Sequence, residues 1–286
     1  MVTTTRNKPI LLLEAPNDDS SPAFVESILS VNAGALAIGL DVYRANRDRL
    51  AQRVPIEDVE ELKDRPVIVY GSIQFVRDIK SPIIPGAYGY HGTDWQTMSA
   101  YMPRSWLLNS DHMMTTFADL EYDFEWWSKI VDPIGLFIRP SSDKKIFPAQ
   151  IVPTQFWRQE MPYIRQLSSV MPETLCVVSG IKTVGDEFRF WIVDRQVVGE
   201  SFYLNAGSYM RARTVAVPQD ARDLAWEVAR MEWQPDSCYV VDICCRTEYE
   251  PAIVEMNSFC SAGVYNSDTG RILQAVVDQA IRDYYP

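Results

Sequence analysis

The sequence predicts an α+β protein, in which a small α/β domain with a parallel sheet precedes a core of mostly antiparallel strands. Two patterns predict this class. In the first third of the chain, apolar runs of strand length alternate with helical spacing, which is typical of parallel strands joined by crossover helices. In the second half, strand-like runs follow one another across short turns. The 286 residues, 47% of them hydrophobic, can form a core and exclude wholesale disorder.

The N-terminal part begins with a continuous apolar strand. Ser21 and Pro22 follow as a helix start, with serine as the N-cap and proline in the first turn. Gly71 and Ser72 resemble a phosphate-binding turn, but no glycine-rich phosphate motif follows, so a simple strand-end turn is expected. The expected elements are strands at 10–13, 41–43 and 67–70, and helices at 24–36, 54–62 and 74–79.

The remainder of the chain begins with residues 80–120, which are rich in aromatic side chains and in loops and show no clear regular element. After them, strand signals dominate. The expected elements are helices at 124–130, 220–231 and 269–284, strands at 136–139 and 176–179, and hairpins joining 188–193 to 196–203 and 239–244 to 252–255. These patterns predict an N-terminal domain at 1–120 and a core at 121–286. The first lobe of the core would cover about 121–182 and the second about 183–286.

Charge and composition argue against several classes of protein. The 27 basic and 38 acidic side chains give a net charge of −11, which argues against nucleic acid as a partner but permits a polyphosphate in a local positive pocket. No run approaches the ~18 consecutive apolar residues of a membrane span, and no secretory signal is evident. We therefore expect a cytoplasmic protein without a membrane segment.

The cysteines and histidines point to no disulfide framework or zinc site. The five cysteines lie in apolar runs, as buried residues of a reducing compartment do, and there is no C-x-x-C pair. A cysteine nucleophile assisted by His91 or His112 is a minor alternative.

Two carboxylates lie in the middle of apolar strands near the C-terminus. Asp242 lies within Tyr-Val-Val-Asp-Ile-Cys-Cys and Glu255 within Ala-Ile-Val-Glu-Met-Asn, and Asn257 shares a strand face with Glu255. A symmetric hairpin would bring the three side chains together as hard oxygen ligands, which suit Mg²⁺. The alternative is that Asp242 pairs with a basic residue while Glu255 faces solvent.

Basic side chains follow the preceding strands. Arg139 and the pair Lys144–Lys145 come after one strand, and Lys182 and Arg189 flank the next strand pair. Arg189 alternates with two phenylalanines and so points to the opposite face. A guanidinium on an inner strand face is a good phosphate ligand, although each of these residues alone could be a surface side chain.

The ordered motifs resemble those of the ATP-grasp enzymes. They are Arg-Pro…Lys-x-Phe, Glu-Phe-Arg-Phe-Trp, and Val-Val-Asp-Ile…Ile-Val-Glu-Met-Asn-Ser-Phe…Ala-Gly, and they cover roughly residues 130–266. The closest resemblance is to the divergent clade marked by one arginine and two lysines. That clade contains many bacterial and phage proteins and the eukaryotic factor that helps assemble a translation initiation complex.

The resemblance implies roles for individual residues. Magnesium would be held by Asp242, Glu255 and Asn257. Arg139 and Lys145 would contact ATP phosphates from one lobe and Arg189 from the other, with Lys145 and Arg189 as catalytic cations. Lys144 is the alternative to Lys145. The hinge, Cys176 to Lys182, would contact adenine through its backbone at Val177, Val178 and Ser179, with Lys182 near the nucleotide.

The resemblance also implies an activity. ATP-grasp enzymes phosphorylate a carboxylate to an acylphosphate, which an amine then attacks, so the expected function is an ATP- and Mg²⁺-dependent ligase for small-molecule, peptide or protein substrates. The acceptor would bind near residues 259–265, with Arg211 and Arg213 as possible carboxylate clamps. The alternative is an assembly factor that binds ATP without ligation. No oligomeric state is predicted.

Overall fold

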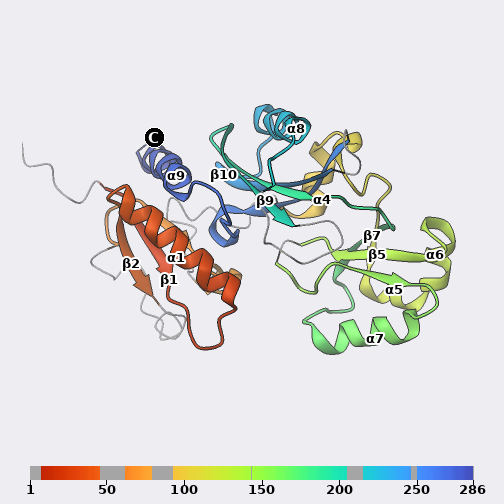
Figure 1. Ribbon diagram of the computed structural model, residues 1–286. Coiled ribbons are helices and arrows are strands. Elements are labelled where there is room, and N and C mark those ends of the chain that lie inside the picture. Colours follow the sequence, from red (N-terminus) through yellow and green to blue (C-terminus); the bar gives the residue numbers. More distant parts are fainter. Residues whose placement is uncertain are drawn as a thin grey trace, which may run out of the picture.

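The computed structural model describes residues 8–45, 62–78, 93–142, 144–204, 215–245 and 250–285. Within these ranges the chain forms one parallel and two antiparallel sheets (Figure 1). This arrangement confirms the predicted α+β class. None of the helices in the described ranges combines the length and apolar character needed to cross a membrane.

The parallel sheet lies at the N-terminus. Its central strand β1 (Ile10–Glu14) pairs with β2 (Asp41–Ala45) and β3 (Val67–Tyr70), as the sequence predicts. Helices α1 (Pro22–Ala37) and α3 (Ile73–Asp78) agree with the two helices predicted around them. The helix predicted at 54–62 lies, except for its last residue, outside the described residues.

The C-terminal helix completes this N-terminal unit. Helix α9 (Thr269–Tyr284), predicted from its amphipathic pattern, packs beside α1, where Gly34 permits close contact (Figure 1). A Cβ atom at Gly34 would lie 2.9 Å from Cγ2 of Thr269. Buried residues of α9 share one core with those of β1 and β3. The end of the chain therefore returns to the domain in which it begins.

One antiparallel sheet has the order β4-β7-β5-β6. Its elements include α4, β4, α5, β6 and α7, none of which the sequence predicted, although α6 agrees with the helix predicted at 124–130. The bounds are α4 (Trp95–Tyr101), β4 (Met113–Thr116), α5 (Phe117–Tyr122), α6 (Phe124–Val131), β5 (Gly135–Pro140), β6 (Gln150–Pro153), α7 (Trp157–Leu167) and β7 (Leu175–Gly180), with a 3-10 turn η3 at Arg104–Trp106.

The other antiparallel sheet has the order β11-β10-β8-β9 and contains both predicted hairpins. Its bounds are β8 (Glu187–Val193), β9 (Gln196–Leu204), α8 (Gln219–Arg230), β10 (Cys238–Cys245), β11 (Pro251–Ser258) and a 3-10 turn η4 (Phe259–Ser261). Asp194 and Arg195 have φ values of 46° and 62°, which match the two-residue turn that joins twisted strands.

The two faces of this sheet have different neighbours. Phe188, Phe190 and Val241 share a core with α8, which covers one face (Figure 1). Trp191 and Val240 share a core with the N-terminal sheet and α9. Because side chains alternate along a strand, the residues between these two sets are assigned to a face by their position alone.

Candidate active site

Three charged side chains lie in a row across the β11-β10-β8-β9 sheet. Arg189 on β8 is directly opposite Asp242 on β10, which in turn is opposite Glu255 on β11. Residues paired in this way point to the same face, here the face opposite α8. The register shifts after Asp242, so that Val254 is an extra residue in β11 beside Glu255. The local sequence therefore places the predicted carboxylates together, as the hairpin pattern indicated.

Asp242 is paired with Arg189. Both carboxylate oxygens accept hydrogen bonds from the guanidinium, at 2.8 and 2.7 Å, and the two side chains are 0% and 5% exposed. Arg189 also donates to the carbonyl of Gly263 at 3.2 Å and lies 4.4 Å from the ring centroid of Tyr203. Burial raises the pKa of Asp242 against the pull of Arg189. Burial lowers the pKa of Arg189, but the Asp242 carboxylate more than offsets this and raises it well above its ordinary value.

Glu255 and Asn257 complete the acidic part of the site. Asn257 Nδ2 donates to Asp242 Oδ2 at 3.1 Å and to Glu255 Oε1 at 3.0 Å. Glu255 Oε2 lies 3.1 Å from Arg139, which comes from β5 in the other antiparallel sheet and also donates to the Val254 carbonyl at 3.4 Å. The pKa of Glu255 is raised by burial, but the Arg139 charge and the Asn257 hydrogen bond lower it below its ordinary value. Arg139 and Glu255 thus join the two sheets.

The predicted magnesium ligands and phosphate ligands are therefore each other's partners in this structure. Of the two alternatives for Asp242, pairing with a basic residue is what the structure contains, whereas Glu255 is not simply turned to solvent, since its side chain is 27% exposed and ion-paired. Within the described ranges no group of three or more His, Cys, Asp or Glu side chains could hold a metal ion. Two carboxylates and one amide are nevertheless hard donors within hydrogen-bond distance of one another, which fits Mg²⁺ whose remaining ligands are water and phosphate.

Lys145 lies at a cavity beside the ion pair. The cavity has a volume of about 170 Å³. The first turn of α1, the end of β3, the η4 segment, Arg189 and Asn257 contribute to its wall, and Tyr203 and Tyr265 add aromatic rings. The charge of Lys145 lowers the pKa of both Asp242 and Glu255, against their burial. The cavity lies where the acceptor was predicted, beside residues 259–265. Lys144 is exposed and does not contribute to it.

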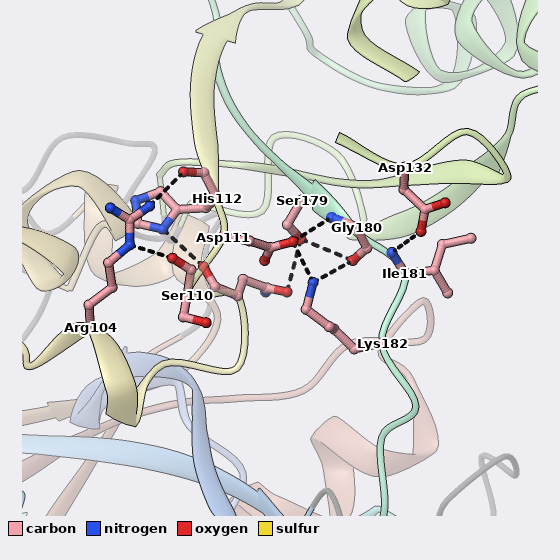
Figure 2. Close-up of polar contacts among 10 residues, drawn as sticks. Arg104, Ser110, Asp111, His112, Asp132, Ser179, Gly180, Ile181 and Lys182 are labelled. Atoms are coloured by element: carbon pink, nitrogen blue, oxygen red, sulfur yellow. Dashed lines mark hydrogen bonds and ion pairs between the residues drawn. The ribbon is translucent and has the colours of Figure 1, made fainter. Parts of the chain in front are cut away.

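The predicted hinge residues lie partly within a strand. Val177 and Val178 pair with β4 on one side and β5 on the other, and Ser179 pairs with Phe137. The backbone of these residues is therefore engaged in the sheet, and their predicted contact with adenine stays a prediction. Lys182 follows the strand and is ion-paired with Asp111 at 2.7 Å (Figure 2).

Several residues near the site were not singled out from the sequence. Glu187 lies two residues before Arg189 on the same face, and burial and the charges of Asp242 and Glu255 raise its pKa to about 7. The strand alternation that identified Arg189 could have identified Glu187 as well. Asp111 and Asp132 lie in turns and have no local pattern that would have identified them.

Other predicted residues do not join the site. His112 donates from Nδ1 to the Asn109 carbonyl at 2.9 Å, and burial raises the pKa of Cys176 to about 12, so neither supports a cysteine nucleophile. No disulfide joins the five cysteines, all of which lie in the described part of the chain. His91, Arg211 and Arg213 lie outside the described residues.

Comparison with known proteins agrees with this arrangement. The family model for the ATP-grasp domain of the clade named for one arginine and two lysines, family 2, matches residues 113–275. No curated protein matches the sequence. Among solved structures, the chain is similar to D-cycloserine synthetase DcsG (TM-score 0.62, 13% identity, 95% of this chain and 99% of that chain covered).

Two further structures have the same fold over nearly their full length. One is D-alanine–D-alanine ligase from Bacillus anthracis (TM-score 0.58, 14% identity, 98% and 99% covered), and the other is the ATP-grasp ligase PsnB complexed with its minimal precursor (TM-score 0.56, 13% identity, 96% and 99% covered). At these identities the likeness concerns the fold, whereas the family match covers more than half of the sequence. The chain therefore belongs to the ATP-grasp family, in family 2 of the clade named for one arginine and two lysines.

Proposed function

We propose that the protein is an ATP-dependent ligase that joins a carboxylate to an amine through an acylphosphate, with a small molecule, a peptide or a protein as substrate. The observation that carries the proposal is the cluster of Arg139, Arg189, Asp242, Glu255 and Asn257 beside a cavity lined by Lys145. The ligase neighbours with the same fold give additional support.

The residues of the cluster suit phosphoryl transfer by positioning and charge neutralisation. Mg²⁺, held by Glu255, Asn257 and Asp242 together with phosphate oxygens, would neutralise phosphate charge when bound. Arg189 is held rigidly by Asp242, so its remaining N–H groups are oriented before any substrate arrives. Lys145 is exposed at the cavity wall and can contact a phosphate from the other sheet.

The proposed reaction has two balanced steps. A carboxylate oxygen of the first substrate attacks the γ-phosphorus of ATP, the bond to the β-phosphate oxygen breaks, and ADP leaves. The amine then attacks the acylphosphate carbonyl and loses a proton, and inorganic phosphate leaves with the electron pair of the broken C–O bond. The cavity between α1 and η4 is the proposed place of the acceptor, where Arg189 and Lys145 attract an anionic group.

Nucleotide binding is tested by thermal stability, because a ligand that binds only the native state raises the melting temperature. Mg·ATP should raise the melting temperature of the wild type by several degrees, and Glu255→Gln should lose most of this rise. Glu250→Gln is the matched control, since Glu250 is exposed and precedes the same strand. Equal rises in wild type and Glu255→Gln would contradict the proposed metal site.

A second candidate is an assembly factor that binds ATP without ligation, because the same cluster would serve both functions. The two are separated by ADP release in the presence of pooled carboxylates, amines and peptides. Continuous substrate-dependent ADP release supports the ligase. Tight binding of Mg·ATP without turnover, together with a stable protein partner, supports the assembly factor.

A further inference from the structure

Two carboxylates hold the start of the segment that connects the two antiparallel sheets (Figure 2). Asp111 Oδ2 accepts hydrogen bonds from the backbone N–H of Gly180 at 3.1 Å and from Lys182 Nζ at 2.7 Å. Asp132 Oδ2 accepts from the N–H of Ile181 at 3.0 Å. Lys182 Nζ donates also to the Gly180 carbonyl at 3.1 Å. The backbone from Gly180 to Lys182 is therefore attached to the sheet that it leaves.

Gly180 is the point at which these groups converge. A Cβ atom there would lie 3.2 Å from Asp111 Oδ2 and 3.4 Å from Lys182 Nζ, so a glycine lets the carboxylate and the ammonium approach the backbone closely. Burial raises the pKa of Asp111, but the hydrogen bonds from Lys182 and from the Gly180 N–H outweigh it and hold the pKa below its ordinary value. Asp111 is therefore an anion at neutral pH.

Asp111 belongs to a segment that touches both sheets. At residues 107–108 this segment meets β11, where Leu107 pairs with Ile253 in parallel and the Leu108 N–H donates to the Ile253 carbonyl at 2.9 Å. At its other end Asn109 accepts a hydrogen bond from Ser179 Oγ at 2.9 Å, next to the contacts of Asp111. We call residues 107–111 the brace.

The brace is stiffened by its own contacts. Arg104 donates to the carbonyls of Ser110 and His112, and His112 Nδ1 donates to the Asn109 carbonyl at 2.9 Å (Figure 2). Its contact with β11 is two residues from Glu255 in sequence. One short segment thus connects the strand of the acidic cluster with Lys182.

We propose that Asp111 is a positioning residue, which attaches the brace to Gly180 and Lys182 and so holds the Lys182 ammonium and the spacing of the two sheets in the arrangement that binds the nucleotide. The inference rests on the proposed function, because it takes the junction of the two sheets as the ATP site. Ordering a lysine side chain before binding removes an entropic cost from the binding step.

The test is a double-mutant cycle on the Kd of Mg·ATP, measured by calorimetry. Asp111→Asn keeps the shape of the side chain and removes its charge. We expect it to raise Kd about three- to tenfold, in line with one partly exposed charge-assisted hydrogen bond. Lys182→Met should also raise Kd, and the double variant should be no weaker than Lys182→Met within about twofold, because both changes remove the same interaction.

Three controls separate positioning from a general structural effect. Asp119→Asn removes the charge of an exposed, hydrogen-bonded aspartate elsewhere in the same lobe, and should leave Kd unchanged. Asp111→Glu keeps the carboxylate and should restore most of the affinity, which decides the matter should Asp111→Asn fold poorly. Lower melting temperature with unchanged Kd would indicate a structural role alone.

The outcomes distinguish the inference from the function on which it rests. If the wild type binds Mg·ATP and Asp111→Asn binds equally well, or if the effects of Asp111→Asn and Lys182→Met on Kd multiply, the inference about Asp111 is wrong and the proposed function stands. If the wild type itself does not bind Mg·ATP, the proposed function is wrong, and the inference fails with it.

Discussion

Arg189 and Asp242 face each other on neighbouring strands and share two hydrogen bonds of 2.8 and 2.7 Å, with both side chains almost completely buried. Taking two charges out of water is costly, and their attraction offsets that cost only when the geometry is good and the remaining hydrogen bonds are made. Asn257 and Gly263 supply these further contacts. The pair therefore makes the rigid centre of the site.

The first prediction concerns this pair. Asp242→Asn leaves the Arg189 charge buried without a carboxylate, so we expect the free energy of unfolding to fall by about 3–5 kcal/mol, measured by urea denaturation. The exposed Glu250→Gln is the control and should change it by less than about 0.5 kcal/mol. A loss below about 1 kcal/mol for Asp242→Asn would show that the pair contributes little.

The second prediction concerns pH. The pKa of Glu187 is raised from 4.5 to about 7, first by burial and then by the nearby carboxylates. Between these two values the unfolded state is ionised while the folded state keeps the proton, so this group lowers stability as the pH rises through this window. Glu187→Gln should therefore gain melting temperature relative to the wild type between pH 5 and pH 8. Parallel curves of melting temperature against pH would refute the shift.

The third prediction compares two buried serines. Ser179 is 0% exposed and donates to Asn109, whereas Ser201 is 4% exposed and its hydroxyl has no partner among the described residues. Ser179→Ala should lower the free energy of unfolding by about 1 kcal/mol or more, because it also leaves the Asn109 oxygen without its donor. Ser201→Ala should be neutral or slightly stabilising. The same urea measurement checks both, and equal losses would contradict the difference in hydrogen bonding.

The fourth prediction compares two glycines. Gly39 follows α1 with a φ of 69°, which an alanine adopts only with strain, and Gly39→Ala should lower the free energy of unfolding by about 1 kcal/mol. Gly270 lies in the first turn of α9, and a Cβ there meets only ordinary contacts at 3.6 and 3.9 Å. Gly270→Ala should therefore be neutral or stabilising by up to about 1 kcal/mol. Thermal unfolding of both variants should give changes of opposite or clearly unequal size.

Much of the fold could be predicted where the local pattern is strong. The apolar run at 10–13, the Ser21–Pro22 helix start and the alternation around Arg189 predicted elements that the structure contains. The elements between residues 93 and 120, and α7, were not predicted. These short segments have weak periodicity and form because they pack against strands distant in the sequence, as β4 does against β7.

The candidate site divides in the same way. The hairpin pattern of the sequence was enough to place Asp242 opposite Glu255 and to turn Arg189 away from its phenylalanine neighbours, because strand alternation and register are local properties. Only the tertiary structure decided that Arg189 neutralises Asp242, that Arg139 reaches Glu255 from the other sheet, and that Asp111 holds Lys182. These pairs join residues 53 to 116 positions apart, and which charges meet depends on how the sheets pack against each other, which no local pattern records.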